Sequence, residues 1–210
     1  MNKNEKVKII AEVAIMTAIA FALDFLQGGL TRGLFPNGGS IGLAMVPILV
    51  LAYRRGFVPA LVSGFILAII QMTGGVYAIA SEWYSVILQI LLDYVLAYPL
   101  VACAGLFYQK FRESEAKSDR IKWIIIGSVL GGFLKYVSHV LSGVLFWKNA
   151  DFAGGPFLYS VLYNGTYMIP NIIIATLLLV LLLNSAPHIF LLVNYHGKSN
   201  NQNEEVKNNE

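Results

Sequence analysis

The stretch LKYVSHVLSGVLFW, residues 134–147, decides the class of fold because it places a lysine and a histidine inside an apolar segment long enough to cross a bilayer. An intramembrane charge costs about 2.5 to 3.5 kcal/mol on insertion scales, so it faces a protein interior or a cavity. Four residues recur in it at four-residue spacing: Lys135, His139, Gly143 and Trp147. With 3.6 residues per turn, this spacing predicts that all four lie on one helix face. The face carries a hydrogen-bond donor, a titratable ring, a position without a side chain and an aromatic ring, in that order.

The composition of the whole chain indicates an all-α integral membrane protein. Of its 210 residues, 57% are hydrophobic and 13% are charged, which is more apolar surface than one soluble core encloses. Six apolar segments predict six transmembrane helices, at residues 9–30, 40–53, 57–72, 86–107, 123–147 and 157–183. The second and third segments are short for a full span, so they form a membrane hairpin or are re-entrant or buried.

The basic residues predict the orientation in the cell membrane. Twelve of the 15 lysines and arginines lie in the N-terminus, the turn at residues 54–55, the loop at 110–122 and the tail, which share one side in a six-span protein. The positive-inside rule therefore puts both termini in the cytoplasm. Because these residues are divided among four segments, they form no single basic patch and do not indicate nucleic-acid binding.

The chain divides into two parts by composition. Residues 1–185 contain all six apolar segments and are expected to form one membrane domain. Residues 186–210 shift to Asn, Lys and Glu and end in NNQNEEVKNNE, without periodicity. We expect this tail to be disordered and cytoplasmic.

Polar residues in the fourth and fifth segments allow two interpretations. Asp93, with Tyr94 beside it, requires a cation, and Lys135 is the other intramembrane charge in the middle of the chain. The two side chains form either a structural ion pair that joins two helices or part of a ligand site.

Aromatic residues gather at the predicted outer ends of the spans. Tyr159, Tyr163 and Tyr167 follow one another at four-residue spacing beside Asn164. Tyrosines near helix ends usually belong to the interfacial belt, and this interpretation also applies to Tyr77 and Trp147. Alternatively, Tyr77, Trp147 and Tyr159 roof one outward-facing pocket above Asp93, Lys135 and Asn164. Aromatic rings over a carboxylate suit a flat, cationic, hydrogen-bonding ligand.

Other motifs restrict the class of protein. In the first span, Ala14 and Ala18 form a small-xxx-small pair, which serves either internal packing or docking of a partner helix. The sequence contains no GxxxxGK[ST], HExxH, GxSxG or paired-cysteine motif. We therefore expect no enzymatic activity, no metal site and no cofactor.

With these residues in view, the chain closely resembles the thiamine-specific substrate-binding subunits (S components) of energy-coupling factor (ECF) transporters. The resemblance covers residues 11–183 and rests on five blocks in order. They are AEVAIMTAIAF from residue 11, PNGGSIGLAMVPIL from residue 36, LLDY from residue 91, LKYVSHVLSGVLFW from residue 134 and YSVLYNGTYMIP from residue 159. It implies six membrane helices with both termini cytoplasmic, in agreement with the count above.

The resemblance also implies a thiamine pocket and its partners. The pocket would be built near the outer face from Tyr77, Asp93, Tyr94, Lys135, His139, Gly143, Trp147, Tyr159 and Asn164. Ala14 and Ala18 would dock the shared transmembrane coupling subunit, and two cytoplasmic ATPase subunits would drive uptake. Some members have a glutamate at the position of Asp93 and a tryptophan in the first outer loop, where this chain has PNGGS with Phe35 nearby.

The chemistry of thiamine agrees with this pocket. Asp93 would compensate the thiazolium cation of thiamine or accept a hydrogen bond from its amine. Trp147 and His139 would stack on the rings of thiamine. Lys135 and Asn164 would hydrogen-bond the remaining edge. His139 is expected to act as a neutral ring, because a further cation beside Lys135 and thiazolium would be repulsive.

Two alternatives to thiamine uptake by a coupled subunit remain open. The same architecture can serve another vitamin or a thiamine precursor. A different class of protein, an autonomous proton-coupled carrier, would use Asp93, Lys135 and His139 as a relay.

Overall fold

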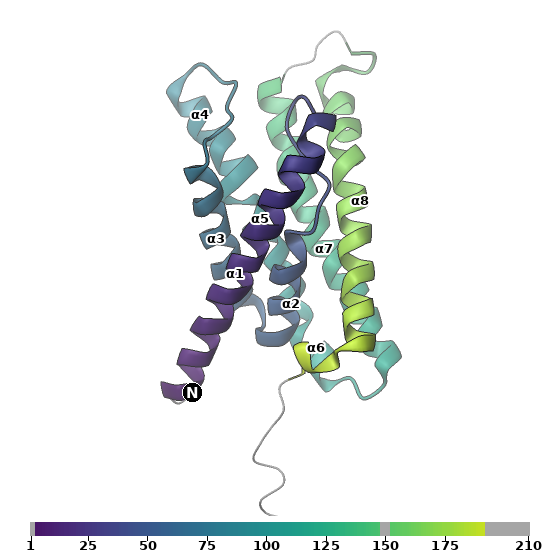
Figure 1. The fold of residues 1–210 in the computed structure, drawn as a ribbon. Helices are drawn as coiled ribbons and strands as arrows, with labels where there is room; N and C mark the ends of the chain where they lie inside the picture. The colour runs from purple at the N-terminus through teal and green to yellow at the C-terminus, as the bar shows by residue number, and fades with distance from the viewer. Residues whose placement is uncertain (1–2, 148–151, 192–210) are drawn as a thin grey trace, which may run out of the picture.

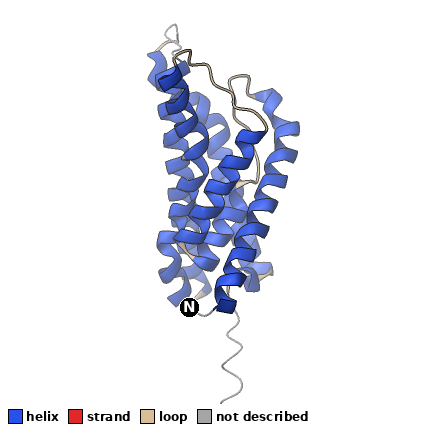
Figure 2. Cartoon of the chain, turned by 90° about the vertical axis from the view of Figure 1, so that its left-hand side faces the viewer, coloured by secondary structure: helices blue, strands red, loops and turns tan. Residues whose placement is uncertain are grey.

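The computed structural model describes residues 3–147 and 152–191, which form a bundle of helices (Figure 1). Within these ranges every regular element is helical and no strand occurs, as predicted (Figure 2). Four stretches are long and apolar enough to cross a membrane: Lys3–Leu34, Trp83–Glu113, Lys117–Trp147 and Gly155–Ser185. They correspond to the first, fourth, fifth and sixth predicted spans, so the prediction of helical spans is confirmed for these four.

The second and third predicted spans are shorter helices. Helix α2 (Met45–Arg55) has 11 residues and α3 (Phe57–Thr73) has 17, and only Gly56 separates them. Gly56 has a φ of +88°, a conformation that glycine adopts readily and that reverses the chain here. The crossing of the membrane by α2 and α3, and the cytoplasmic placement of both termini, stay predictions.

Helix α1 (Lys3–Thr31) runs obliquely across the bundle and is followed by the 3₁₀ turn η1 (Arg32–Leu34) (Figure 1). Its buried residues are Val13, Thr17, Ala20, Asp24 and Gly28. Their spacing of three or four residues defines one stripe along the helix. Thr17 forms a 2.8 Å hydroxyl–hydroxyl hydrogen bond with Ser63 of α3, which ties the two helices together.

The fourth span is irregular, whereas the sequence predicts a continuous helix over residues 86–107. It consists of α4 (Trp83–Ile90), the π-helical turn η2 (Leu91–Val95), α5 (Ala97–Val101), the 3₁₀ segment η3 (Ala102–Phe107) and α6 (Tyr108–Glu113). Within η2, Leu96 N donates to Leu91 O at 2.8 Å, a bond across five residues. Pro99 lies in the short helix α5 and lacks an N–H, so one hydrogen bond of the helical ladder is missing next to the π turn.

Helices α7 (Lys117–Ser142) and α8 (Gly155–Ser185) lie side by side, and α7 ends in a second π-helical turn, η4 (Gly143–Trp147) (Figure 1). Glycines allow close contacts elsewhere in the bundle. A Cβ on Gly64 of α3 would lie 2.8 Å from Pro99 N of α5, and one on Gly131 of α7 would lie 2.5 Å from Val101 O. Small residues thus let backbones approach, as is typical of membrane helices.

Both ends of the described chain lie at the same end of the bundle (Figure 1). After α8, the 3₁₀ turn η5 (Pro187–Ile189) leads to Phe190, whose side chain is fully buried. Arg54 donates to the carbonyls of His188 and Ile189 and to Glu12 of α1, at 2.9 to 3.0 Å. The domain boundary at residue 185 stays a prediction, and residues 192–210 of the predicted tail lie outside the described residues.

Candidate functional site

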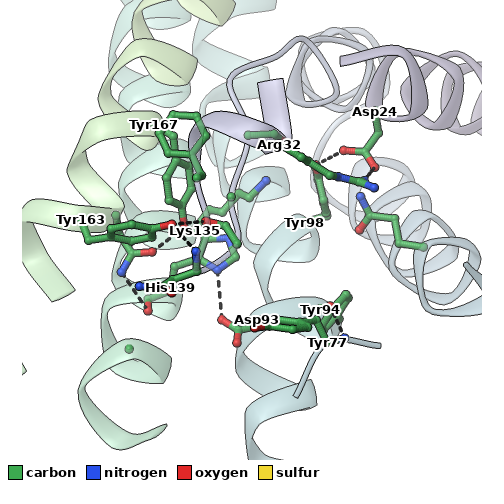
Figure 3. A pocket seen from close by; sticks show the side chains of 18 of the residues that line it. Asp24, Arg32, Tyr77, Asp93, Tyr94, Tyr98, Lys135, His139, Tyr163 and Tyr167 are labelled. Atoms are coloured by element: carbon green, nitrogen blue, oxygen red, sulfur yellow. Dashed lines mark hydrogen bonds and ion pairs between the residues drawn. The ribbon is translucent and has the colours of Figure 1, made fainter. Parts of the chain in front are cut away.

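A cavity of about 620 Å³ lies at the other end of the bundle, between the loop that contains PNGGS (residues 36–40), the end of α3, and helices α1, α5, α7 and α8 (Figure 3). All nine residues proposed for a substrate pocket line it: Tyr77, Asp93, Tyr94, Lys135, His139, Gly143, Trp147, Tyr159 and Asn164. The fold therefore brings together side chains from four separate segments of the chain. Their role in binding stays a prediction.

Asp93 is the carboxylate on one wall of this cavity, and the π turn η2 carries it. A π turn holds an extra residue and often marks a functional site. Oδ2 of Asp93 accepts a 2.6 Å hydrogen bond from Ser142 Oγ, and Oδ1 lies 3.2 Å from His139 Nδ1. Because an ionised carboxylate only accepts, the proton of a neutral His139 belongs on Nδ1, and its Nε2 is an acceptor.

Lys135 does not pair with Asp93, so the structural ion pair considered from the sequence is not formed. In the described part of the chain no carboxylate lies within 4.0 Å of the lysine, although its side chain is buried. Instead, Nζ lies 3.5 Å from the ring centroid of Tyr98 on α5. The ammonium group therefore rests on an aromatic face, where the ring quadrupole attracts it.

Asp24 is a second carboxylate of the cavity wall; it is buried, and the sequence analysis did not identify it. It accepts a 3.2 Å hydrogen bond from Tyr98 Oη and another of 3.2 Å from Gln27 Nε2. Arg32, whose side chain is mostly exposed, approaches it to 3.5 Å (Figure 3). The sequence does contain a signal for this residue, because an acidic side chain within the first apolar segment requires a partner in the protein interior.

Aromatic side chains close the cavity near Asp93. The rings of Tyr77 and Trp147 lie with centroids 5.7 Å apart. Tyr94 accepts a 2.9 Å hydrogen bond from the backbone N–H of Tyr77 and so holds this loop over the site. Tyr77 and Trp147 are therefore neighbours in the cavity wall, and their role as a roof over a ligand stays a prediction.

The loop that contains PNGGS (residues 36–40) packs against three tyrosines of α8. Tyr159 accepts a 2.7 Å hydrogen bond from Asn37 Nδ2. Tyr163 accepts from Asn37 N and donates to Gly38 O, both at 2.9 Å. Phe35 meets Tyr167 edge to face at 5.5 Å. In this chain, therefore, Phe35 and Asn37 hold the PNGGS loop against α8.

Asn164 and Gly143 join α7 to α8 in the cavity wall. Asn164 Nδ2 donates to His139 O of α7 at 3.4 Å and to Ser160 O of α8 at 2.9 Å, and its Oδ1 accepts from Tyr167 Oη. A Cβ at Gly143 would overlap Ser160 Oγ and lie 3.3 Å from Asn164 Nδ2. Only glycine therefore lets the end of α7 approach α8 this closely.

The remaining predicted residues, Ala14 and Ala18, are exposed on α1, away from the buried stripe of that helix. A partner helix can reach them there, and their docking role stays a prediction. Among the described residues, no group of three or more His, Cys, Asp or Glu side chains is arranged to hold a metal ion.

Comparisons with known proteins agree on one family. The profile described as thiamine transporter protein (Thia_YuaJ) matches residues 10–191. The chain is 33% identical over 193 residues to thiamine transporter ThiT of Bacillus subtilis, with 90% of this chain and 97% of that protein covered. It is 30% identical over 195 residues to thiamine transporter ThiT of Lacticaseibacillus paracasei, with coverages of 91% and 94%.

A solved structure of ThiT from Listeria monocytogenes has the same fold. It superposes with a TM-score of 0.75 at 29% identity, and the match covers 89% of this chain and 99% of that one. Together with the apolar spans, these matches indicate a multi-pass protein of the cell membrane. The chain belongs to the thiamine transporter protein family (Thia_YuaJ).

Proposed function

We propose that this protein binds thiamine with high affinity in the 620 Å³ cavity and is the substrate-binding subunit (S component) of an ECF transporter. The observation that carries this proposal is the carboxylate of Asp93 on the wall of an aromatic cavity. Thiamine combines a permanent cation with flat rings and an exocyclic amine. A fixed carboxylate beside aromatic faces meets each of these requirements.

Asp93 would accept from the amine of thiamine or compensate its cation. Its hydrogen bonds from Ser142 and His139 hold the carboxylate in place before the ligand arrives, which reduces the entropy lost on binding. Trp147, with Tyr77 beside it, would stack on a ring of the ligand. Lys135 would donate to the remaining edge of the ligand.

Asn164, Tyr94, Tyr159 and Gly143 would contribute mainly to the shape of the pocket. The Asn164 amide already bonds to Ser160 and Tyr167, and Tyr159 already bonds to the first outer loop. Their contacts with neighbours support walls that keep their form in the absence of ligand. Binding energy is then used for recognition instead of rearrangement.

Transport would require partners, since no nucleotide-binding motif occurs in the sequence. We propose that a transmembrane coupling subunit docks on the exposed Ala14 and Ala18 of α1. Small residues allow a partner helix to approach closely in a membrane. Two cytoplasmic ATPase subunits would then power uptake, and the chain itself would have no enzymatic activity.

Thiamine binding is tested by titrating the purified protein while recording intrinsic fluorescence. We expect saturable quenching at submicromolar thiamine, because Trp147 lies in the cavity wall. Asp93→Ala should abolish binding, and Trp147→Phe should remove the quenching. Trp83 is 74% exposed and outside the cavity, so Trp83→Phe is the matched control and should keep both. Failure of the folded wild-type protein to bind thiamine would contradict the proposal.

Dependence on partner subunits is tested separately by uptake into vesicles. Vesicles that contain this chain alone should not accumulate thiamine when a pH gradient is imposed. Vesicles that also contain a coupling subunit and ATPases should accumulate it only with ATP, and replacement of Ala14 and Ala18 by leucine should abolish this. Uptake driven by the pH gradient in this chain alone would instead support the autonomous carrier.

A further inference from the structure

Lys135 is a buried cation without a direct ionic partner. Its side chain extends from α7 and is buried in the bundle, and in the described part of the chain no carboxylate lies within 4.0 Å of it. A lone intramembrane ammonium group is unfavourable unless an opposite charge or an aromatic face stabilises it. The negative charge that balances this lysine therefore lies beyond the side chain that the lysine contacts directly.

Tyr98 of α5 provides the first contact. The Nζ atom lies 3.5 Å from the ring centroid, well within the distance for a cation–π interaction. The ring is itself buried, so water screens this interaction little. Gly64 of α3 packs against the Pro99 backbone, which keeps the neighbouring turn of α5 in place.

Asp24 of α1 provides the negative charge behind the ring. The hydroxyl of Tyr98 donates to its Oδ1 at 3.2 Å, and the carboxylate is 5% exposed. Gln27 and Arg32 bind the same carboxylate and restrict its position. A phenol that donates to a carboxylate gains electron density in its ring, and hydrogen bonds in a low dielectric polarise one another. The ring face under Lys135 is thereby more attractive to a cation.

We propose that Asp24 and Tyr98 are positioning residues for Lys135: they form a lysine–ring–carboxylate series that holds the ammonium group charged and aimed into the thiamine cavity. The inference rests on the proposed thiamine-binding function. It assigns to α1 a part in ligand recognition, although none of the nine residues proposed for the pocket lies on that helix.

A purely structural role for Asp24 would be to tie α1 to α5. Under that role, its replacement would loosen the bundle and would affect binding whether or not Lys135 is present. Under the proposed role, Asp24 affects thiamine binding only because it positions Lys135. The two roles therefore differ in the coupling between the two positions, which a double-mutant cycle measures.

The experiment measures the thiamine Kd of the full-length protein, by calorimetry, for Asp24→Asn, Lys135→Met and the double variant. We expect each single change to raise Kd on the order of tenfold, and the double variant to match Lys135→Met alone. Tyr98→Phe keeps the ring and loses the hydroxyl, so it should raise Kd less than Asp24→Asn does. Asp24→Glu keeps the charge and should restore most of the affinity.

Thr17→Val is the matched control on the same stripe of α1. It removes the hydrogen bond to Ser63 of α3 without touching Tyr98, so it should leave the thiamine Kd unchanged. If the losses from Asp24→Asn and Lys135→Met multiply, or if Asp24→Asn and Tyr98→Phe both bind as wild type, the inference is overturned while the proposed function stands. Absence of thiamine binding by the wild-type protein would overturn both.

Discussion

The close approach of Gly143 to α8 predicts that a single added methyl group disturbs the cavity. In Gly143→Ala, the new Cβ would overlap Ser160 Oγ and lie 3.3 Å from Asn164 Nδ2. To relieve the overlap, Ser160 must turn away from Val140 O, to which it now donates at 2.8 Å. Loss of this hydrogen bond costs about 1 kcal/mol, and overpacking adds about 1–3 kcal/mol.

Part of this cost is offset, because alanine is favoured over glycine in a helix by about 1 kcal/mol. The net loss of stability expected for Gly143→Ala is therefore about 1–3 kcal/mol. Since the strained contact lies in the cavity wall beside Asn164, we also expect the thiamine Kd to rise about tenfold, which corresponds to about 1.4 kcal/mol. Calorimetry gives the Kd, and the thermal unfolding midpoint reports the stability.

Gly165→Ala is the matched control, because it introduces the same methyl group on α8 where there is space. Its Cβ would lie 3.6 Å from Ile169 Cδ1 and 3.9 Å from Tyr136 Oη, which are ordinary contacts. We expect an unchanged Kd and an equal or higher unfolding midpoint. Equal affinities and equal midpoints for the two alanine variants would refute the reasoning from close packing.

Three further predictions follow from other contacts. Asn37→Ala removes the 2.7 Å hydrogen bond to Tyr159 and should raise the thiamine dissociation rate about fivefold, which corresponds to a loss of about 1 kcal/mol. Stopped-flow fluorescence measures this rate, and an unchanged rate would show that the hydrogen bond does not retain the ligand. Thiamine affinity should fall as the pH is lowered into the acidic range, because a protonated His139 places another cation beside Lys135. Kd measured against pH checks this, and stronger binding at acidic pH would contradict a neutral ring. Glu12→Gln should lower the free energy of unfolding by about 2 kcal/mol, because Arg54 and Arg55 lose charge-assisted hydrogen bonds to Glu12. The thiamine Kd should stay within about twofold, because these residues lie at the end of the bundle opposite the cavity, and a larger change in Kd would contradict this.

Much of the architecture is predictable because it depends on local composition. Long apolar runs define four of the spans, and the Arg54–Arg55–Gly56 turn marks the reversal between α2 and α3. The four-residue spacing from Lys135 to Trp147 predicts one helix face, and these residues line one cavity. Periodicity along a single helix is a property of neighbouring residues, so the sequence contains it directly.

The irregular fourth span is harder to predict. Its apolar pattern continues through Leu91 and Pro99, and hydropathy does not distinguish α-helical from π-helical or 3₁₀ turns. A Cβ added to Gly105 would lie 2.6 Å from the Cα of Phe57 in α3. This close contact and the π turn η2 depend on how the fourth span packs against α3.

The sequence by itself determined the class of protein, four of the apolar spans and a part of the polar residues that face the cavity, among them Asp93, Lys135 and His139. Only the tertiary structure decided the partners of those residues: Ser142 for Asp93, 49 residues apart, and Asp24 for Tyr98, 74 residues apart. These pairs depend on the rotation and relative height of separate helices. Such quantities are set by packing between spans, and no spacing within one span encodes them.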